Sequence, residues 1–175
     1  MFDKELIESM LNTPIRNYAV PGLTSCLVGG GDYGRVRLFE SERSQQRDIT
    51  PHSHRFDFQC FVLHGFVTNR IWERQSSGWG DKFRETALVY LGEPGKYETK
   101  PVDNSFWTYQ DSKYETGTTY SMKAEEVHSI FFSKGARVLF FEGPARLCES
   151  IVLEPIVTGE VIPTFKTEEW MFKRS

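Results

Sequence analysis

Apolar and polar residues along this chain alternate mainly with the period of a β-strand. Residues 35–39 alternate between the two classes, and residues 56–67 form a long apolar run that Gly65 divides. Further runs, separated by glycine, proline and polar residues, cover residues 68–73, 86–91, 105–110, 118–122, 129–132, 137–141 and 148–153. About ten short strands at this spacing predict an all-β fold of closed or sandwiched antiparallel strands.

The first dozen residues differ from the rest because their apolar side chains fall at helical spacing. Phe2, Leu6 and Met10 recur every four residues, and Pro14 would end a helix. We therefore expect a short N-terminal helix over about residues 1–13.

Two glycine-containing segments have the composition of tight turns. Residues 76–80 separate two strand-like runs, and residues 134–135 separate two others. Both segments predict β-hairpins, in which the strands on either side pair with each other.

Composition narrows the class of protein. A length of 175 residues, with 39% hydrophobic and 26% charged residues, is typical of one globular domain. A net charge of −3 argues against nucleic acid as a partner. The three cysteines, Cys26, Cys60 and Cys148, are too few for a disulfide framework. We find no secretory signal and no apolar stretch long enough to cross a membrane, so we expect a cytoplasmic chain without a membrane partner.

Histidine placement is the strongest chemical signal. His52 and His54 come just before the longest apolar run, and His128 begins another run. Side chains alternate along a strand, so both imidazoles of a His-x-His pair point to one side. A third imidazole from a distant strand would complete a three-nitrogen metal site, and imidazole suits iron, zinc, copper and nickel.

Around these histidines the chain resembles the cupin superfamily, the RmlC-like proteins in which a small β-barrel holds a metal between two motifs. The first cupin motif is His-x-His followed by Glu, and here His52 and His54 are followed by Gln59. The second motif begins with Gly and reaches its His eleven positions later, which is the spacing of Gly117 and His128.

This resemblance implies a fold and its boundaries. We expect a single cupin-like domain over residues 1–175, built on an antiparallel β-barrel (a double-stranded β-helix or jelly roll) over about residues 22–153. The short helix would precede the barrel, and residues 154–175 would form a C-terminal extension.

The resemblance also implies that His52, His54 and His128 hold a divalent metal. Gln59 stands where cupins usually have Glu, and it offers a neutral carbonyl oxygen or an amide donor. A three-histidine site of this kind is similar to that of the cysteine dioxygenase branch, which uses ferrous iron and dioxygen on small thiols. Fe(II) is the expected ion, with zinc, manganese and nickel as alternatives.

Two neighbours of Gln59 are relevant to this site. Asp57 would lie beside the metal in place of Gln59 if a bulge shifted the register of the strand. Cys60 would face the opposite way from Gln59 on a regular strand. That parity argues against the crosslinked thiol dioxygenase arrangement, in which a cysteine occupies the position of Gln59.

Three further side chains are candidates for a pocket wall. Tyr120 lies on the strand that leads toward His128, and Arg70 and Trp72 lie on a strand that could cross the barrel. Arg70 could pair with a substrate carboxylate through two hydrogen bonds. Residues of these types more often belong to the core or the surface than to a pocket wall.

These observations support three functional hypotheses. The leading one is a mononuclear non-haem iron dioxygenase acting on a small molecule. The second is a non-redox isomerase, epimerase or lyase acting on a sugar or small acid, with the metal as a Lewis acid. The third is a small-molecule-binding cupin without catalysis. All three expect a small-molecule ligand and are compatible with a homodimer.

Overall fold

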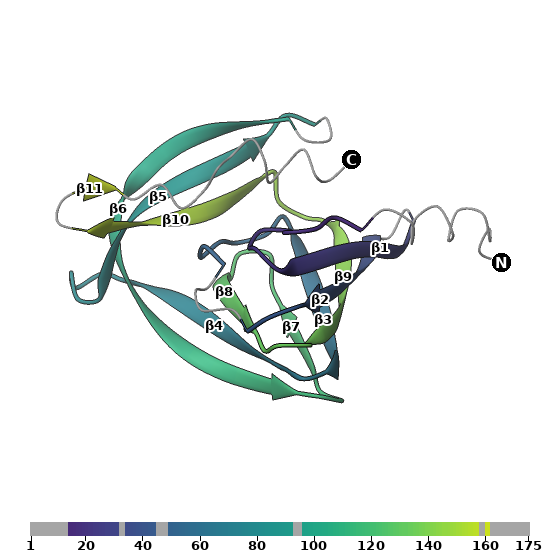
Figure 1. Ribbon diagram of the computed structural model, residues 1–175. Helices are drawn as coiled ribbons and strands as arrows, with labels where there is room; N and C mark the ends of the chain where they lie inside the picture. The colour runs from purple at the N-terminus through teal and green to yellow at the C-terminus, as the bar shows by residue number, and fades with distance from the viewer. Residues whose placement is uncertain (1–13, 32–33, 45–48, 93–95, 158–159, 162–175) are drawn as a thin grey trace.

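The computed structural model is built almost wholly of β-strands (Figure 1). It describes residues 14–31, 34–44, 49–92, 96–157 and 160–161. These residues form eleven strands and no α-helix, which confirms the predicted all-β class. The helix predicted over about residues 1–13 lies outside the described residues. Nowhere in the described ranges is there a helix with the length and hydropathy needed to span a bilayer.

One sheet contains five antiparallel strands in the order β1-β2-β9-β3-β7. Its strands are β1 (Leu23–Gly31), β2 (Gly34–Ser41), β9 (Arg137–Ala145), β3 (Phe56–His64) and β7 (Thr119–Met122).

The second sheet contains six antiparallel strands in the order β11-β10-β5-β6-β4-β8. Its strands are β11 (Glu160–Val161), β10 (Glu149–Val157), β5 (Asp81–Tyr90), β6 (Tyr97–Glu115), β4 (Phe66–Gln75) and β8 (Val127–Phe132). The first half of the long strand β6 pairs with β5 and its second half pairs with β4. Figure 1 shows β6 running from the β5–β10 side of the sheet down past β4.

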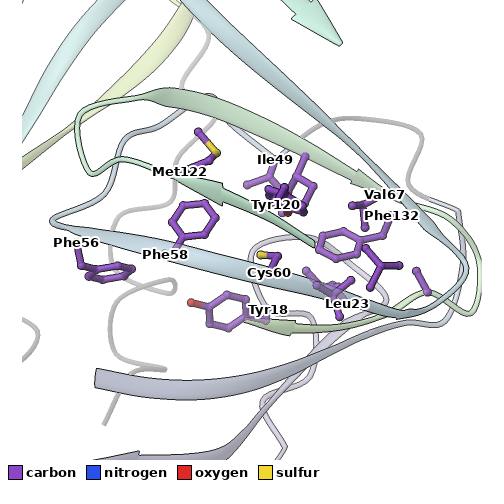
Figure 2. Packing of buried hydrophobic residues seen from close by; sticks show 14 residues of the cluster. Tyr18, Leu23, Ile49, Phe56, Phe58, Cys60, Val67, Tyr120, Met122 and Phe132 are labelled. Atoms are coloured by element: carbon purple, nitrogen blue, oxygen red, sulfur yellow. The ribbon is translucent and has the colours of Figure 1, made fainter. Parts of the chain in front are cut away.

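The main core lies between the two sheets and follows from strand alternation. On β3, Phe56, Phe58, Cys60 and Val62 are buried, whereas Gln59 between them is exposed. Buried side chains from β7, β4 and β8 complete the same cluster (Figure 2). Two curled antiparallel sheets packed in this way are consistent with a cupin β-barrel.

Both hairpin predictions are wrong, because turn residues specify a reversal of the chain but not the partner of each strand. Residues 76–80 connect β4 to β5, yet these strands lie on opposite sides of β6. Residues 134–135 connect β8 to β9, which belong to different sheets. In the second case Phe132 and Val138 are both buried in the core between the sheets. The strand β10 also continues to Val157, so the predicted extension begins within a strand.

Candidate metal centre

The segment that carries His52 and His54 is held in an extended conformation by three other parts of the chain. His52 exchanges two backbone hydrogen bonds of 2.9 Å with His128 on β8. The backbone nitrogen of His54 donates to the carbonyl of Ala124 at 2.9 Å. Ser53 points the other way, and its Oγ accepts a 2.8 Å hydrogen bond from the backbone nitrogen of Ile151. The alternation that the sequence predicts therefore directs both imidazoles to one side.

Hydrogen bonds assign the proton on two of the three imidazoles. His52 Nδ1 lies 2.7 Å from the carbonyl oxygen of Thr50, which can only accept, so Nδ1 carries the proton. His128 Nδ1 lies 2.7 Å from Asn69 Oδ1, while Asn69 Nδ2 donates to the sulfur of Met122 at 3.2 Å. With Nδ1 protonated on both rings, each Nε2 presents a lone pair, as metal-binding histidines commonly do.

The three rings converge closely enough to share one ion. One ligand nitrogen from each of His52, His54 and His128 lies within 4.8 Å of the other two. The Nε2 atoms of His54 and His128 are 3.0 Å apart. Two nitrogens bound at right angles, each about 2.1 Å from a metal, would be separated by roughly 3.0 Å. A pair at the 4.8 Å limit would exceed the roughly 4.2 Å that one such ion can span, so a ring shift of at most about half an ångström would close the site.

Burial keeps His128 in the form that binds metal. Desolvation holds the pKa of His128 well below its usual range, and the neighbouring His52 lowers it further. His128 is therefore a neutral imidazole near pH 7. Three imidazole nitrogens fit a borderline ion such as ferrous iron or zinc.

A mainly apolar cavity of about 70 Å³ adjoins the three rings. This is several times the roughly 10–15 Å³ that one water requires. Phe56, Phe58 and Phe140 surround His54, with ring centroids 5.3, 4.8 and 6.2 Å from its own. Figure 2 shows Phe56 and Phe58 of β3 among the buried side chains of the core. The cavity can therefore hold a small molecule beside the histidines while limiting water.

The structure does not bring Gln59 or Asp57 to the histidines. Gln59 lies on the exposed face of β3, and Phe58 takes the inward position beside His54 and His128. Asp57 also faces outward, where it accepts hydrogen bonds from the backbone nitrogen of Ala124 at 2.9 Å and from Arg146 at 2.7 and 2.8 Å. The register irregularity between Phe56 and Phe58 leaves Asp57 outside the cavity.

Replacing Asp57 by Asn should destabilise the protein in a pH-dependent way. The Ala124 backbone N–H, followed by Arg146, holds the pKa of the Asp57 carboxyl below its usual value. A lowered folded-state pKa gives stability that is present above the unfolded-state pKa of about 3.9 and is lost as the pH falls below it. Thermal unfolding should therefore separate D57N from the unsubstituted chain at pH 7, and the two should converge toward pH 3. A constant difference over this range would contradict the assignment.

Arg70 and Trp72 also lie away from the histidines. Arg70 forms a two-bond pair with Asp111 at 2.7 and 2.9 Å and lies 3.8 Å from the centre of the Tyr109 ring. Trp72 is buried in a separate core cluster, and its Nε1 donates to Ser129 at 3.0 Å. Both side chains have structural partners on the second sheet.

Tyr120 does line the cavity, as the sequence suggested, and it faces Cys60 across the β3–β7 pair. Burial raises the pKa of Cys60 to about 12, although the neighbouring Tyr120 hydroxyl opposes this shift. Burial, followed by Cys60, raises the pKa of Tyr120 well above its usual value. Both groups are therefore protonated near pH 7.

Three polar residues of this region were not identified from the sequence: Asn69, Arg37 and Glu142. Asn69 shares one face of β4 with Val67 and Ile71, so a polar residue in this apolar series could have been identified from the sequence as a candidate site residue. Arg37 and Glu142 gave no such signal, because charged residues on strands normally face solvent.

No protein-family model matches the chain, and no curated protein matches it in sequence. Solved structures similar to it include KdgF from Halomonas sp., with 11% identity and a TM-score of 0.45 over 82% of this chain and 94% of that chain. Hydroxypropylphosphonic acid epoxidase from S. wedmorenis has 11% identity and a TM-score of 0.45, covering 77% of this chain and 57% of its own. An RmlC-like cupin from Shewanella frigidimarina NCIMB 400 has 10% identity and a TM-score of 0.41, covering 70% and 78%.

These similarities concern the fold alone. The candidate metal centre is identified from the chain itself, in which His52 and His54, ahead of β3, meet His128 from β8 between the two sheets. Cupins are among the solved structures that this chain resembles, and its three-histidine cluster is a candidate metal site.

Proposed function

We propose that this protein is a mononuclear non-haem iron dioxygenase that acts on a small molecule. One observation carries the proposal: three imidazoles from two distant segments converge beside a largely apolar cavity. The imidazole donor set fits ferrous iron, and three neutral protein ligands leave further coordination positions open. When bound, Fe(II) supplies the one-electron chemistry toward dioxygen that amino-acid side chains lack.

The surrounding residues would hold and orient these ligands. The Thr50 carbonyl and Asn69 Oδ1 accept from the Nδ1 atoms of His52 and His128, and so keep both Nε2 atoms directed into the site. Phe58 and Phe140, whose ring centroids are 4.7 Å apart, form an apolar wall beside His54. Such a wall limits water near reactive species.

The donor set also supports a second candidate, a non-redox enzyme that uses zinc, manganese or nickel as a Lewis acid. Three imidazoles with an open position are an established arrangement for catalytic zinc. The two candidates differ in one measurable property, because only the first consumes dioxygen.

The test begins with the metal content of protein purified without added metal. Metal-free protein is then loaded anaerobically with Fe(II), Zn(II), Mn(II) or Ni(II), and dioxygen uptake is recorded with a panel of small acids, thiols and hydroxy compounds. One iron per chain and substrate-dependent dioxygen uptake would support the dioxygenase. Metal binding with turnover but without dioxygen uptake would favour the Lewis-acid alternative, and failure to bind any of these ions would refute both.

A further inference from the structure

Arg37 is a buried arginine that faces the same cavity as the three histidines. Its residue exposure is 4%, and it lies on the inward face of β2 together with Phe39. Across the sheet it pairs with Phe140, whose ring lies 6.2 Å from that of His54. The guanidinium therefore shares the cavity with the metal centre.

The hydrogen-bonding capacity of Arg37 is not fully used by the described residues. Nη1 donates to Ser25 Oγ at a long 3.3 Å, and Nε has no hydrogen-bond partner there. Glu142 Oε1 lies 3.5 Å from Nε, close enough for charge attraction but without a hydrogen bond. Buried charged groups are usually both paired and hydrogen-bonded, so an unsatisfied Nε donor beside a cavity points to a further acceptor.

The balance of charges around the cavity also indicates an anionic ligand, and this step rests on the proposed metal site. Among the described residues that line the cavity, Arg37 is the one permanently cationic side chain and Glu142 the one acidic side chain. These two charges cancel, and the three histidines are counted as neutral metal ligands. A divalent ion would then leave the cavity with two uncompensated positive charges, which an anionic ligand would neutralise.

We propose that Arg37 binds the carboxylate of a small acidic substrate whose other end reaches the metal. The planar guanidinium matches the two oxygens of a carboxylate, with which it can form two parallel hydrogen bonds. Without substrate, the Glu142 carboxylate is the charged partner of the Arg37 guanidinium, and the substrate carboxylate replaces it on binding. This inference rests on the proposed metal site and adds a substrate class to it.

The test measures binding of oxalate, malonate, succinate and glutarate to the full chain loaded with Zn(II), by titration calorimetry at fixed pH. The substitution Arg37→Met should weaken the best of these ligands by about 10- to 100-fold, the usual contribution of a charge-assisted hydrogen bond. Glu142→Gln should strengthen binding several-fold because it removes the competing carboxylate. Arg35→Met, an exposed position on the same strand, removes the same charge and should change little.

The outcomes separate this inference from the proposed function. If the unsubstituted chain holds no metal, the proposed function fails and this inference fails with it. If metal is retained, but the Arg37→Met and Glu142→Gln variants both bind dicarboxylates as tightly as the unsubstituted chain does, the two residues form a purely structural pair and the inference is wrong. Should the Arg37 variant not fold, the Glu142 variant decides alone, because unchanged affinity there contradicts displacement. Arg37-dependent binding of inorganic phosphate without dicarboxylate binding would overturn the choice of carboxylate.

Discussion

Alanine in place of His54 is expected to abolish stoichiometric metal binding. The side chain of His54 offers one ligand nitrogen to the cluster, and alanine removes it. His54 Nε2 lies 3.0 Å from His128 Nε2. A group that merely orients a ligand contributes about 10- to 100-fold to metal affinity, so loss of a ligand should cost at least about 100-fold. Metal content after gel filtration and competition with a chelator would measure this. His52→Ala and His128→Ala should behave in the same way.

The chain contains its own control for this experiment. His64 is exposed at the end of β3, away from the three clustered histidines. His64→Ala removes one imidazole and leaves the cluster intact, so it should keep one metal per chain. A His54 variant that retains full metal content would refute the three-histidine site, whereas equal loss in both variants would indicate nonspecific binding through imidazoles.

The sequence could predict that part of the histidine cluster which depends on local geometry. His52 and His54 face one side because an extended backbone alternates its side chains, and this holds whatever the strand is paired with. The convergence of His128 depended instead on the cupin resemblance. In the structure it results from a pair of backbone hydrogen bonds with His52, across a sequence separation that no local pattern reveals.

The misplaced site residues reflect uncertainty in strand register. On β3 the side chains of Phe58 and Cys60 face inward, so Gln59 faces outward. Its separation from His54 along the sequence nevertheless matches the cupin motif. On β4 the inward position belongs to Asn69, and its neighbour Arg70 pairs with Asp111 on the other face. A shift of one residue exchanges the two faces of a strand, and only pairing with neighbouring strands determines which face is buried.

Apolar patterning also fails where charge is buried. The alternation over residues 35–39 assigns Val36 and Leu38 to the core and Arg37 to solvent, yet Arg37 is the buried member. A core position that accepts arginine departs from the hydrophobic pattern that specifies the rest of the barrel. Such departures in a protein interior are expected at functional sites, which is consistent with the role proposed for the Arg37–Glu142 pair.

Replacing Asn69 by Ala should weaken metal binding by about 10- to 100-fold without removing any metal ligand. Asn69 is 1% exposed, and its Oδ1 accepts from His128 Nδ1, so the substitution frees the His128 ring to rotate and to change tautomer. It also leaves a buried donor without its acceptor, which should lower the free energy of unfolding by about 1–3 kcal/mol. Chelator competition and denaturant unfolding would measure the two effects separately.

Ser129→Ala is the matched control, because Ser129 is adjacent to His128 on β8 but faces the other core cluster. Its hydroxyl accepts from Trp72 Nε1 at 3.0 Å, so its loss should also destabilise the protein by about 1–3 kcal/mol. This variant should nevertheless keep the metal affinity of the unsubstituted chain. If Asn69→Ala and Ser129→Ala weakened metal binding equally, the effect would reflect general loosening of β8, and the orienting role of Asn69 would have to be abandoned.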